Sequence, residues 1–294
     1  MNHTASKEHN LARQVDAAQS LLTTPAAAEA HRLEQALAQV CRAYAAAVQR
    51  TTPAAGAGVL SNQAGVAIFA GSGSPLTQGL AMGLSGPVTR EDLDQLEAHL
   101  APTGGGRQVE LCPFADPTLP ALLAERGYRV HEWQLVWTCS LKAPPLPTRP
   151  PDPELRLRRV PTDQPEAIDR YFHAVMAGFL ESEQVPAEAI ALLRPTAFAA
   201  QQELYVACLG DEVIGGASLS WAGGVAFVNG SGVRPAFRRR GAQGALIRAR
   251  LQRARELGCD IACSSTLPGT ASRRNMERHG FSVTYPKLVL LKDG

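Results

Sequence analysis

One stretch of the sequence gathers the residues best suited to binding an anion. It reads Val233-Arg-Pro-Ala-Phe-Arg-Arg-Arg-Gly-Ala-Gln-Gly-Ala-Leu-Ile247. The apolar residues before it predict a strand, and the apolar spacing after it predicts a helix from about Ala242 to Leu257. The first turn of a helix has unpaired N–H groups at the positive end of the helix dipole. Gly241 and Gly244 leave room for a ligand to reach that backbone, so the stretch is predicted to bind phosphate.

Two common phosphate-binding motifs do not fit this loop. A Walker loop for ATP or GTP needs Gly-x4-Gly-Lys-Ser/Thr, and no lysine follows the glycines here. A dinucleotide fingerprint needs three glycines as Gly-x-Gly-x-x-Gly, and only two are present. The residues alone therefore leave open which phosphate ligand is bound. They also leave open that the arginines form a solvated loop or contact nucleic acid.

The loop resembles the signature of the GNAT acetyltransferase superfamily, which is Arg/Gln-x-x-Gly-x-Gly/Ala between a strand and a helix. Here Arg238-x-x-Gly241-x-Gln243 fits, except that Gln243 replaces the second small residue and Gly244 follows it. The resemblance implies that backbone N–H groups of the loop hold the pyrophosphate of acetyl-CoA. It also implies that the strand from Phe227 to Val233 pairs with the pantetheine arm.

A second feature of the superfamily lies downstream. A predicted strand from Asp260 to Ser265 is followed by a predicted helix that ends at Gly280-Phe281. An asparagine of this helix commonly contacts CoA in the superfamily, and here it is Asn275. The resemblance spans about residues 154–294 and implies acetyl-CoA as a cosubstrate, with no metal. The implied CoA-binding residues are Val233, Arg238, Arg239, Arg240, Gly241, Ala242, Gln243, Gly244, Ala245 and Asn275.

The residues that would move protons are not defined by the sequence. Acetylation of an amine needs a base or a water chain, and many members use a tyrosine as acid for the leaving thiolate. Met276 stands in the place of that tyrosine and cannot donate a proton. Tyr285 on the last predicted strand is the candidate acid. Glu181 and Glu183, between two predicted helices, are the candidate bases, so the catalytic residues stay unknown.

The elements around the loop alternate between helices and strands, which predicts an α+β fold with a mixed sheet. The expected strands include a continuous one from Val225 to Val233, directly before the loop. The other expected elements are a strand from Glu154 to Val160, helices from Gln164 to Phe179 and Ala187 to Ala200, a hairpin of Glu203 to Leu209 with Val213 to Ser220, a helix from Thr270 to His279 and a last strand from Phe281 to Leu291.

The first half of the chain has a related skeleton. Leu123-Ala-Glu-Arg-Gly-Tyr-Arg-Val130 lines up with Met276-Glu-Arg-His-Gly-Phe-Ser-Val283, each a helix that ends at a glycine before a strand. We therefore expect two tandem GNAT-like domains, although chance similarity of a common junction is the alternative. The expected elements are helices at 26–50, Thr89 to Leu100 and Thr118 to Arg126, and strands at Gly65 to Ala70, Gly79 to Leu84, Val109 to Cys112 and Tyr128 to Leu141.

The first copy is predicted to be degenerate. In place of the arginine-glycine loop it reads Ser85-Gly-Pro-Val-Thr-Arg-Glu-Asp92, in which Glu91 and Asp92 would repel pyrophosphate and Pro87 lacks an N–H donor. Thr89 and Asp92 stand at the spacing of a capping box. The proline-rich segment from Ala143 to Pro153 predicts a stiff connector. The expected division is a tail at 1–25, a degenerate domain at 26–142, a linker at 143–153 and an acetyltransferase domain at 154–294.

Composition narrows the class of protein. The chain has 294 residues, 45% hydrophobic and 19% charged, and a net charge of +2, which argues against a dedicated nucleic-acid binder. No apolar run approaches the ~20 residues that cross a bilayer, so no membrane partner is expected and the location is expected to be cytoplasmic. The six cysteines are expected to be free thiols. A monomer or a homodimer is expected.

These features together predict an N-acetyltransferase that moves an acetyl or other acyl group from acetyl-CoA to a primary amine of a small molecule or protein. The alternative is a protein that binds acyl-CoA, or acts by interaction, without catalysing transfer. That alternative draws on Met276 and on the lack of a carboxylate in the strand from Val225 to Val233.

Overall fold

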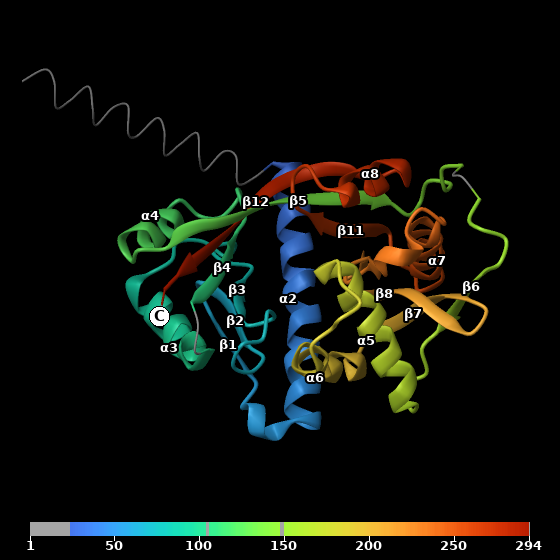
Figure 1. The fold of residues 1–294 in the computed structure, drawn as a ribbon. Helices are drawn as coiled ribbons and strands as arrows, with labels where there is room; N and C mark the ends of the chain where they lie inside the picture. Colours follow the sequence, from blue (N-terminus) through green and yellow to red (C-terminus); the bar gives the residue numbers. More distant parts are fainter. Residues whose placement is uncertain (1–23, 104–105, 148–149, 294) are drawn as a thin grey trace, which may run out of the picture.

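The computed structural model describes residues 24–103, 106–147 and 150–293, so most of the expected tail at 1–25 lies outside the described residues. Its strands form one twelve-stranded sheet in the order β1-β2-β3-β4-β12-β5-β11-β9-β8-β7-β6, with β10 on β8 (Figure 1). Parallel pairs (β3 with β4, β9 with β11) occur among antiparallel ones, which confirms the expected mixed α+β class. The strands are β1 (Gly58–Asn62), β2 (Gly65–Phe69), β3 (Gln78–Leu80), β4 (Arg107–Leu111), β5 (Arg129–Ser140), β6 (Leu155–Arg159), β7 (Gln202–Leu209), β8 (Glu212–Ala222), β9 (Val225–Phe227), β10 (Gly232–Val233), β11 (Ile261–Thr266) and β12 (Ser282–Lys292).

Helices cover both faces of the sheet in the second half. On β7, Leu204 and Val206 pack against α5, whereas Ala207, the residue after Val206, packs against α7. Alternate side chains of a strand point to opposite faces, so these two helices lie on opposite sides. The helices are α2 (Pro25–Thr51), α3 (Arg90–Leu100), α4 (Thr118–Glu125), α5 (Pro165–Leu180), α6 (Ala187–Leu193), α7 (Ala242–Glu256) and α8 (Ala271–Arg278), with 3-10 turns at 53–55, 101–103, 194–198 and 235–237.

The two halves exchange their closing strands. The last strand, β12, lies between β4 and β5, and β5 lies between β12 and β11. The β5–β12 pairing is long, from Thr138 opposite Ser282 to Arg129 opposite Leu291. Figure 1 shows both strands spanning from one half to the other. The division of the chain into the predicted domains stays a prediction, but the sheet is continuous across the boundary between the halves.

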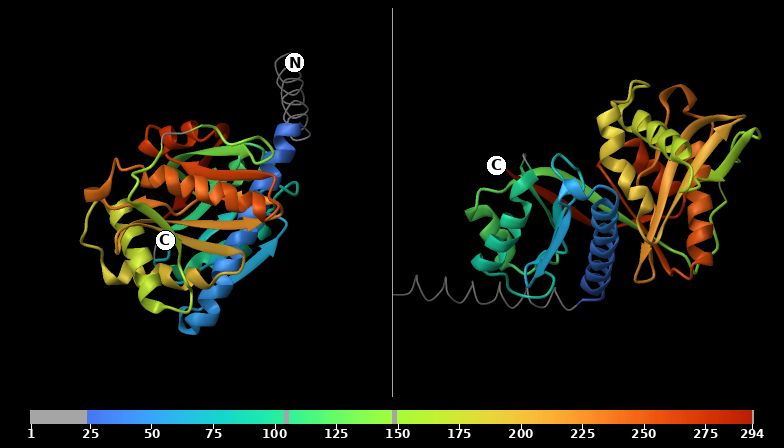
Figure 2. Two further views of the ribbon diagram at one scale, coloured as in Figure 1. Left: turned by 90° about the vertical axis from the view of Figure 1, so that its right-hand side faces the viewer. Right: turned by 90° about the horizontal axis from the view of Figure 1, so that it is seen from below.

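Helix α2 lies between the halves (Figure 2) and contacts the second half along its length. Its Arg32 pairs with Asp260, and its Tyr44 hydroxyl lies 2.7 Å from Ser220 Oγ. Arg50 Nη2 donates to the Phe198 carbonyl at 2.9 Å. Within the apolar core that α2 shares with β9, β11 and β12, Lys287 forms ion pairs with Glu110 and Glu34.

Three sequence predictions of strands and helices need correction. The strand expected from Gly79 to Leu84 ends at Leu80, because Ala81 and Gly83 have positive φ angles of 50° and 66°. The helix expected from Ala187 to Ala200 ends at Leu193, and the chain continues as a 3-10 turn that contains Pro195. β1 was not expected.

The third correction concerns the strand expected to run from Val225 to Val233. It is broken: β9 ends at Phe227, and β10 starts at Gly232. Gly230 between them has φ +56°, a left-handed conformation that ordinary strand residues do not adopt. β9 pairs with both β8 and β11, whereas β10 pairs with β8, so the sheet opens between β10 and the end of β11.

Candidate functional site

A cleft of about 1360 Å³ opens where β10 and β11 separate. One wall is the loop from Val233 to Gly244, and the opposite wall is the end of β11 with α8, including Asn275. The end of α5 and the prolines of the linker close the remaining sides. The predicted CoA-binding residues therefore gather around one cleft, except for Ala245, which is buried in the core under α7. Their roles stay predictions.

The start of α7 has no side-chain cap. Its N-cap is Gly241 with φ +80°, and the first backbone hydrogen bond of the helix runs from Ala245 N to the Gly241 carbonyl at 3.0 Å. The N–H groups ahead of Ala245 are therefore left for a ligand. A Cβ at residue 241 would lie 3.0 Å from Pro151 Cα, so glycine is required by conformation and by space.

The break between β9 and β10 leaves a second set of donors. Within the described residues, the N–H groups of Asn229, Gly230 and Ser231 donate no backbone hydrogen bond. Side chains here link the two walls: Ser264 Oγ donates to Asn229 Oδ1 at 3.2 Å, and Ser231 Oγ donates to Gln243 Oε1 at 3.1 Å. Of these three residues, Ser231 lines the cleft. Unpaired backbone donors beside a cleft suit a carbonyl oxygen or an oxyanion.

The candidate bases both pair with arginines of the loop. Glu181 Oε1 lies 3.1 Å from Arg238 Nη1, and Glu183 Oε2 lies 2.8 Å from Arg234 Nε. Glu181 lines the cleft, and Glu183 is not among the lining residues. The sequence reasoning missed this pairing, because the glutamates and arginines are more than fifty positions apart in the chain.

The candidate acid, Tyr285, lies elsewhere. Its side chain is buried, it does not line the cleft, and its hydroxyl donates to Glu34 Oε1 at 2.6 Å. Burial and the neighbouring Glu34 carboxylate raise the pKa of this phenol far above its ordinary value. Met276, in the usual place of the acid, is buried in the apolar core. Neither position 276 nor position 285 therefore presents a tyrosine hydroxyl to the cleft.

The linker contributes to the site, which the sequence did not indicate. Pro150, Pro151 and Asp152 line the cleft. Asp152 N donates to the Arg240 carbonyl at 3.2 Å, and its carboxylate pairs with the Arg240 guanidinium at 3.2 Å. Residues 150–152 therefore form a wall beside the predicted pyrophosphate loop. Proline density predicts stiffness, but it does not predict where a connector packs.

The His279 ring packs beside the first turn of α7. Its Nδ1 donates to the Asn275 carbonyl at 2.7 Å, and a Cβ on Gly244 would lie 3.4 Å from its ring. Burial lowers the pKa of His279, so the ring is neutral at pH 7. The buried ring therefore ties α8 to the first turn of α7.

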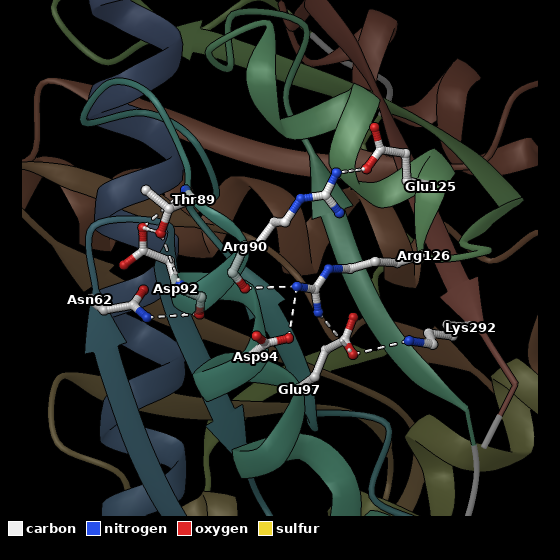
Figure 3. Close-up of polar contacts among 9 residues, drawn as sticks. All are labelled: Asn62, Thr89, Arg90, Asp92, Asp94, Glu97, Glu125, Arg126 and Lys292. Atoms are coloured by element: carbon white, nitrogen blue, oxygen red, sulfur yellow. Dashed lines mark hydrogen bonds and ion pairs between the residues drawn. The ribbon is translucent and has the colours of Figure 1, made fainter.

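The helix start in the first half that corresponds to the start of α7 is capped differently. Thr89 Oγ1 accepts from Asp92 N at 3.2 Å, and Thr89 N donates to Asp92 Oδ2 at 3.1 Å, which confirms the expected capping box at the start of α3. Arg126, which the repeat aligns with His279, pairs with Asp94 and Glu97 on α3 (Figure 3). This helix start is therefore capped by its own acidic side chain.

Comparison with known proteins gives a family match in the second half of the chain. Residues 168–281 match the family model described as acetyltransferase (GNAT) family. This match lies in the half of the chain that carries the cleft, and it covers the strand, the loop and the helix α7 beside it. No curated protein matches the chain.

Solved structures show the same fold over most of the chain. A GCN5-related N-acetyltransferase from Kribbella flavida is 17% identical with a TM-score of 0.62, covering 87% of this chain and 95% of that one. One from Sphaerobacter thermophilus is 18% identical with a TM-score of 0.52, over 81% and 76%. A tandem GNAT protein from the clavulanic acid biosynthesis pathway is 15% identical with a TM-score of 0.54, over 79% and 76%. The expected tandem GNAT fold is confirmed.

Two features are absent from the described residues. None of their helices is long and apolar enough to span a membrane. They contain no cluster of three or more histidine, cysteine, aspartate or glutamate side chains arranged to hold a metal ion. All six cysteines are free thiols.

Proposed function

We propose that this protein is an N-acetyltransferase, which moves the acetyl group of acetyl-CoA to a primary amine of a small molecule or protein. The observation that carries the proposal is that two sets of unpaired backbone donors lie along one cleft. The uncapped start of α7, which suits a pyrophosphate, lines the same cleft as Ser231 of the open strand break, where backbone donors suit a thioester.

The residues present fit CoA at the pyrophosphate end. Gly241 opens the backbone of the helix start, and Arg239 and Arg240 add positive charge. Asn275 lines the opposite wall with an amide that can donate and accept. In the first half, the Thr89–Asp92 capping box occupies the corresponding donors. We therefore propose one acetyl-CoA site per chain.

In the proposed reaction, the amine nitrogen attacks the thioester carbon and its lone pair forms the new C–N bond. The carbonyl oxygen becomes an oxyanion next to the N–H groups of Asn229, Gly230 and Ser231. The C–S bond then breaks, the thiolate of CoA leaves, and the amine proton passes to water or a base. Glu181 is the better placed of the two candidate bases because it lines the cleft.

The proposal is tested by two measurements on the full chain. Calorimetry is expected to give one acetyl-CoA per chain, and a panel of primary amines is expected to include acceptors that release CoA thiol. Binding without CoA release from any amine would favour the alternative, a non-catalytic acyl-CoA-binding protein. Absence of binding would contradict both.

A further inference from the structure

Arg250 on α7 is a buried cation without a counter-ion. Its exposure is 0%, and no carboxylate contributes to its electrostatic surroundings in the described part of the chain. Its guanidinium instead contacts carbonyl oxygens: Nη1 lies 2.8 Å from Ser218 O and 3.1 Å from Asn229 O, and Nε lies 3.0 Å from Leu246 O. Nη2 has no partner among the described residues. Burying such a charge is costly, and packing alone does not require it.

Arg250 contacts one carbonyl within the strand break and one on the neighbouring strand. Ser218 is on β8, and Asn229 is the second residue after β9. The Asn229 carbonyl also accepts from Ser218 Oγ at 3.1 Å and from Ser218 N at 3.4 Å, so two side chains and one backbone N–H hold it. The C=O and N–H of one trans peptide point in opposite directions. Holding the Asn229 carbonyl toward Arg250 therefore directs the Gly230 N–H away from Arg250.

The two ionisable groups that face Arg250 do not neutralise its positive charge. The ionisable side chains that act on it are Tyr171 on α5 and Tyr205 on β7. Burial raises the pKa of both phenols, so they are neutral at pH 7. Burial lowers the pKa of Arg250 itself to about 10, which keeps the guanidinium protonated at pH 7.

We propose that Arg250 is a positioning residue for acyl transfer: it sets the peptide orientation at the strand break, and its uncompensated charge favours the thiolate of CoA over the thiol. The inference rests on the proposed function, because it assumes that CoA binds with its sulfur near the break. The positive charge of Arg250 would thereby stabilise the leaving sulfur, which a general acid would otherwise do by protonating it. A nearby positive charge lowers the pKa of a thiol, so the sulfur can leave as thiolate and take no proton.

The test measures the pKa of the thiol of bound CoA. The ultraviolet absorbance of the thiolate is recorded during a pH titration, and the pKa is taken from it. Wild type is expected to lower this pKa relative to free CoA. Arg250→Gln, which keeps amide donors but removes the charge, is expected to raise it by at least about 0.5 relative to wild type. Arg250→Lys, which keeps the charge, is expected to stay close to wild type. Calorimetric affinity for CoA is expected to change less than about threefold, because the pyrophosphate loop is untouched.

Arg253→Gln is the matched control. It removes a positive charge from the same helix, but Arg253 pairs with Glu203 and Glu256 and does not contact the break. It is expected to leave the thiol pKa unchanged. The charged or titratable groups that line the cleft stay the same in every variant: Arg238, Arg239, Arg240, Arg248, Arg278, Asp152, Glu181 and His279.

The outcomes separate the two proposals. If CoA binds and wild type leaves its thiol pKa equal to that of free CoA, the inference on Arg250 is overturned while the proposed function stands. This comparison needs no variant, so it holds even if Arg250→Gln does not fold. An equal thiol pKa in wild type and folded Arg250→Gln overturns it as well. If wild type binds no CoA, the proposed function and this inference are both wrong.

Discussion

At the scale of residues, the candidate site combines a contiguous loop at the start of α7 with a buried arginine in the middle of the same helix. The loop from Arg238 to Gly244 is contiguous, so its spacing alone predicts an anion site. Arg250 cannot be found in the same way. It stands on a helix rich in arginine, and it contacts the Asn229 carbonyl in a strand break that the alternation of apolar residues does not reveal. Residues whose function depends on tertiary contacts need the structure.

Tyr285→Phe tests whether a phenol serves as the acid. The buried hydroxyl donates to Glu34 and does not line the cleft, so kcat is expected to fall less than about fivefold, against the ~10²–10⁴ of a general acid. Loss of a buried hydrogen bond to a charged partner is expected to destabilise the fold by about 1–3 kcal/mol. Steady-state kinetics and urea unfolding measure the two effects. A loss of kcat beyond a hundredfold in the folded variant would make Tyr285 the acid.

At the scale of elements, most helices and strands follow from periodicity, and the errors fall where the backbone leaves its regular conformation. The end of β3 and the break after β9 both involve residues with positive φ, Ala81 and Gly230. An isolated alanine or glycine in an apolar run gives little warning of such a turn. The starts of α3 and α7 were distinguishable from sequence, because Thr89 and Asp92 form a local cap whereas Gly241 has no capping side chain.

Thr89→Ala tests the difference between these helix starts. The substitution removes the capping box of α3, and it is expected to destabilise the protein by about 1 kcal/mol. Acetyl-CoA affinity is expected to stay within about twofold, because the first half is proposed to bind none. Thermal unfolding and calorimetry measure the two quantities. Appearance or loss of an acetyl-CoA site in this variant would show that α3 takes part in binding.

At the scale of the whole molecule, the repeat of helix, glycine and strand correctly predicted a tandem arrangement. It could not predict the exchange of β5 and β12, because pairing partners of long strands are chosen by three-dimensional packing and not by local pattern. The exchange makes each half part of the sheet of the other. We call the junction between the two halves, where β12 lies between β4 and β5, the seam. The buried Lys287 on β12 pairs there with Glu110 and Glu34 of the first half.

Lys287→Met tests how strongly the seam depends on that cluster. Removing the lysine leaves two buried carboxylates without their cation, and the expected cost is about 3–5 kcal/mol. Lys292→Met is the matched control on the same strand, since Lys292 is partly exposed and pairs with Glu97, and its expected cost is below about 1 kcal/mol. Urea unfolding measures both. Equal costs, or separate transitions for the two halves in wild type, would contradict the account of the seam.

The central claim is that the start of α7 binds the pyrophosphate of acetyl-CoA, and paired glycine variants at the two ends of that helix test it most directly. Gly241 and Gly258 both have left-handed φ angles, +80° and +76°, so valine strains either position. Only at Gly241 would a side chain crowd the cleft, because a Cβ at Gly258 meets no atom within 4 Å.

Calorimetry of acetyl-CoA with folded Gly241→Val and Gly258→Val separates these effects. Gly241→Val is expected to weaken binding at least about tenfold, which corresponds to ~1.4 kcal/mol, while Gly258→Val binds like wild type. Wild-type affinity in Gly241→Val would contradict the claim and place the anion site elsewhere.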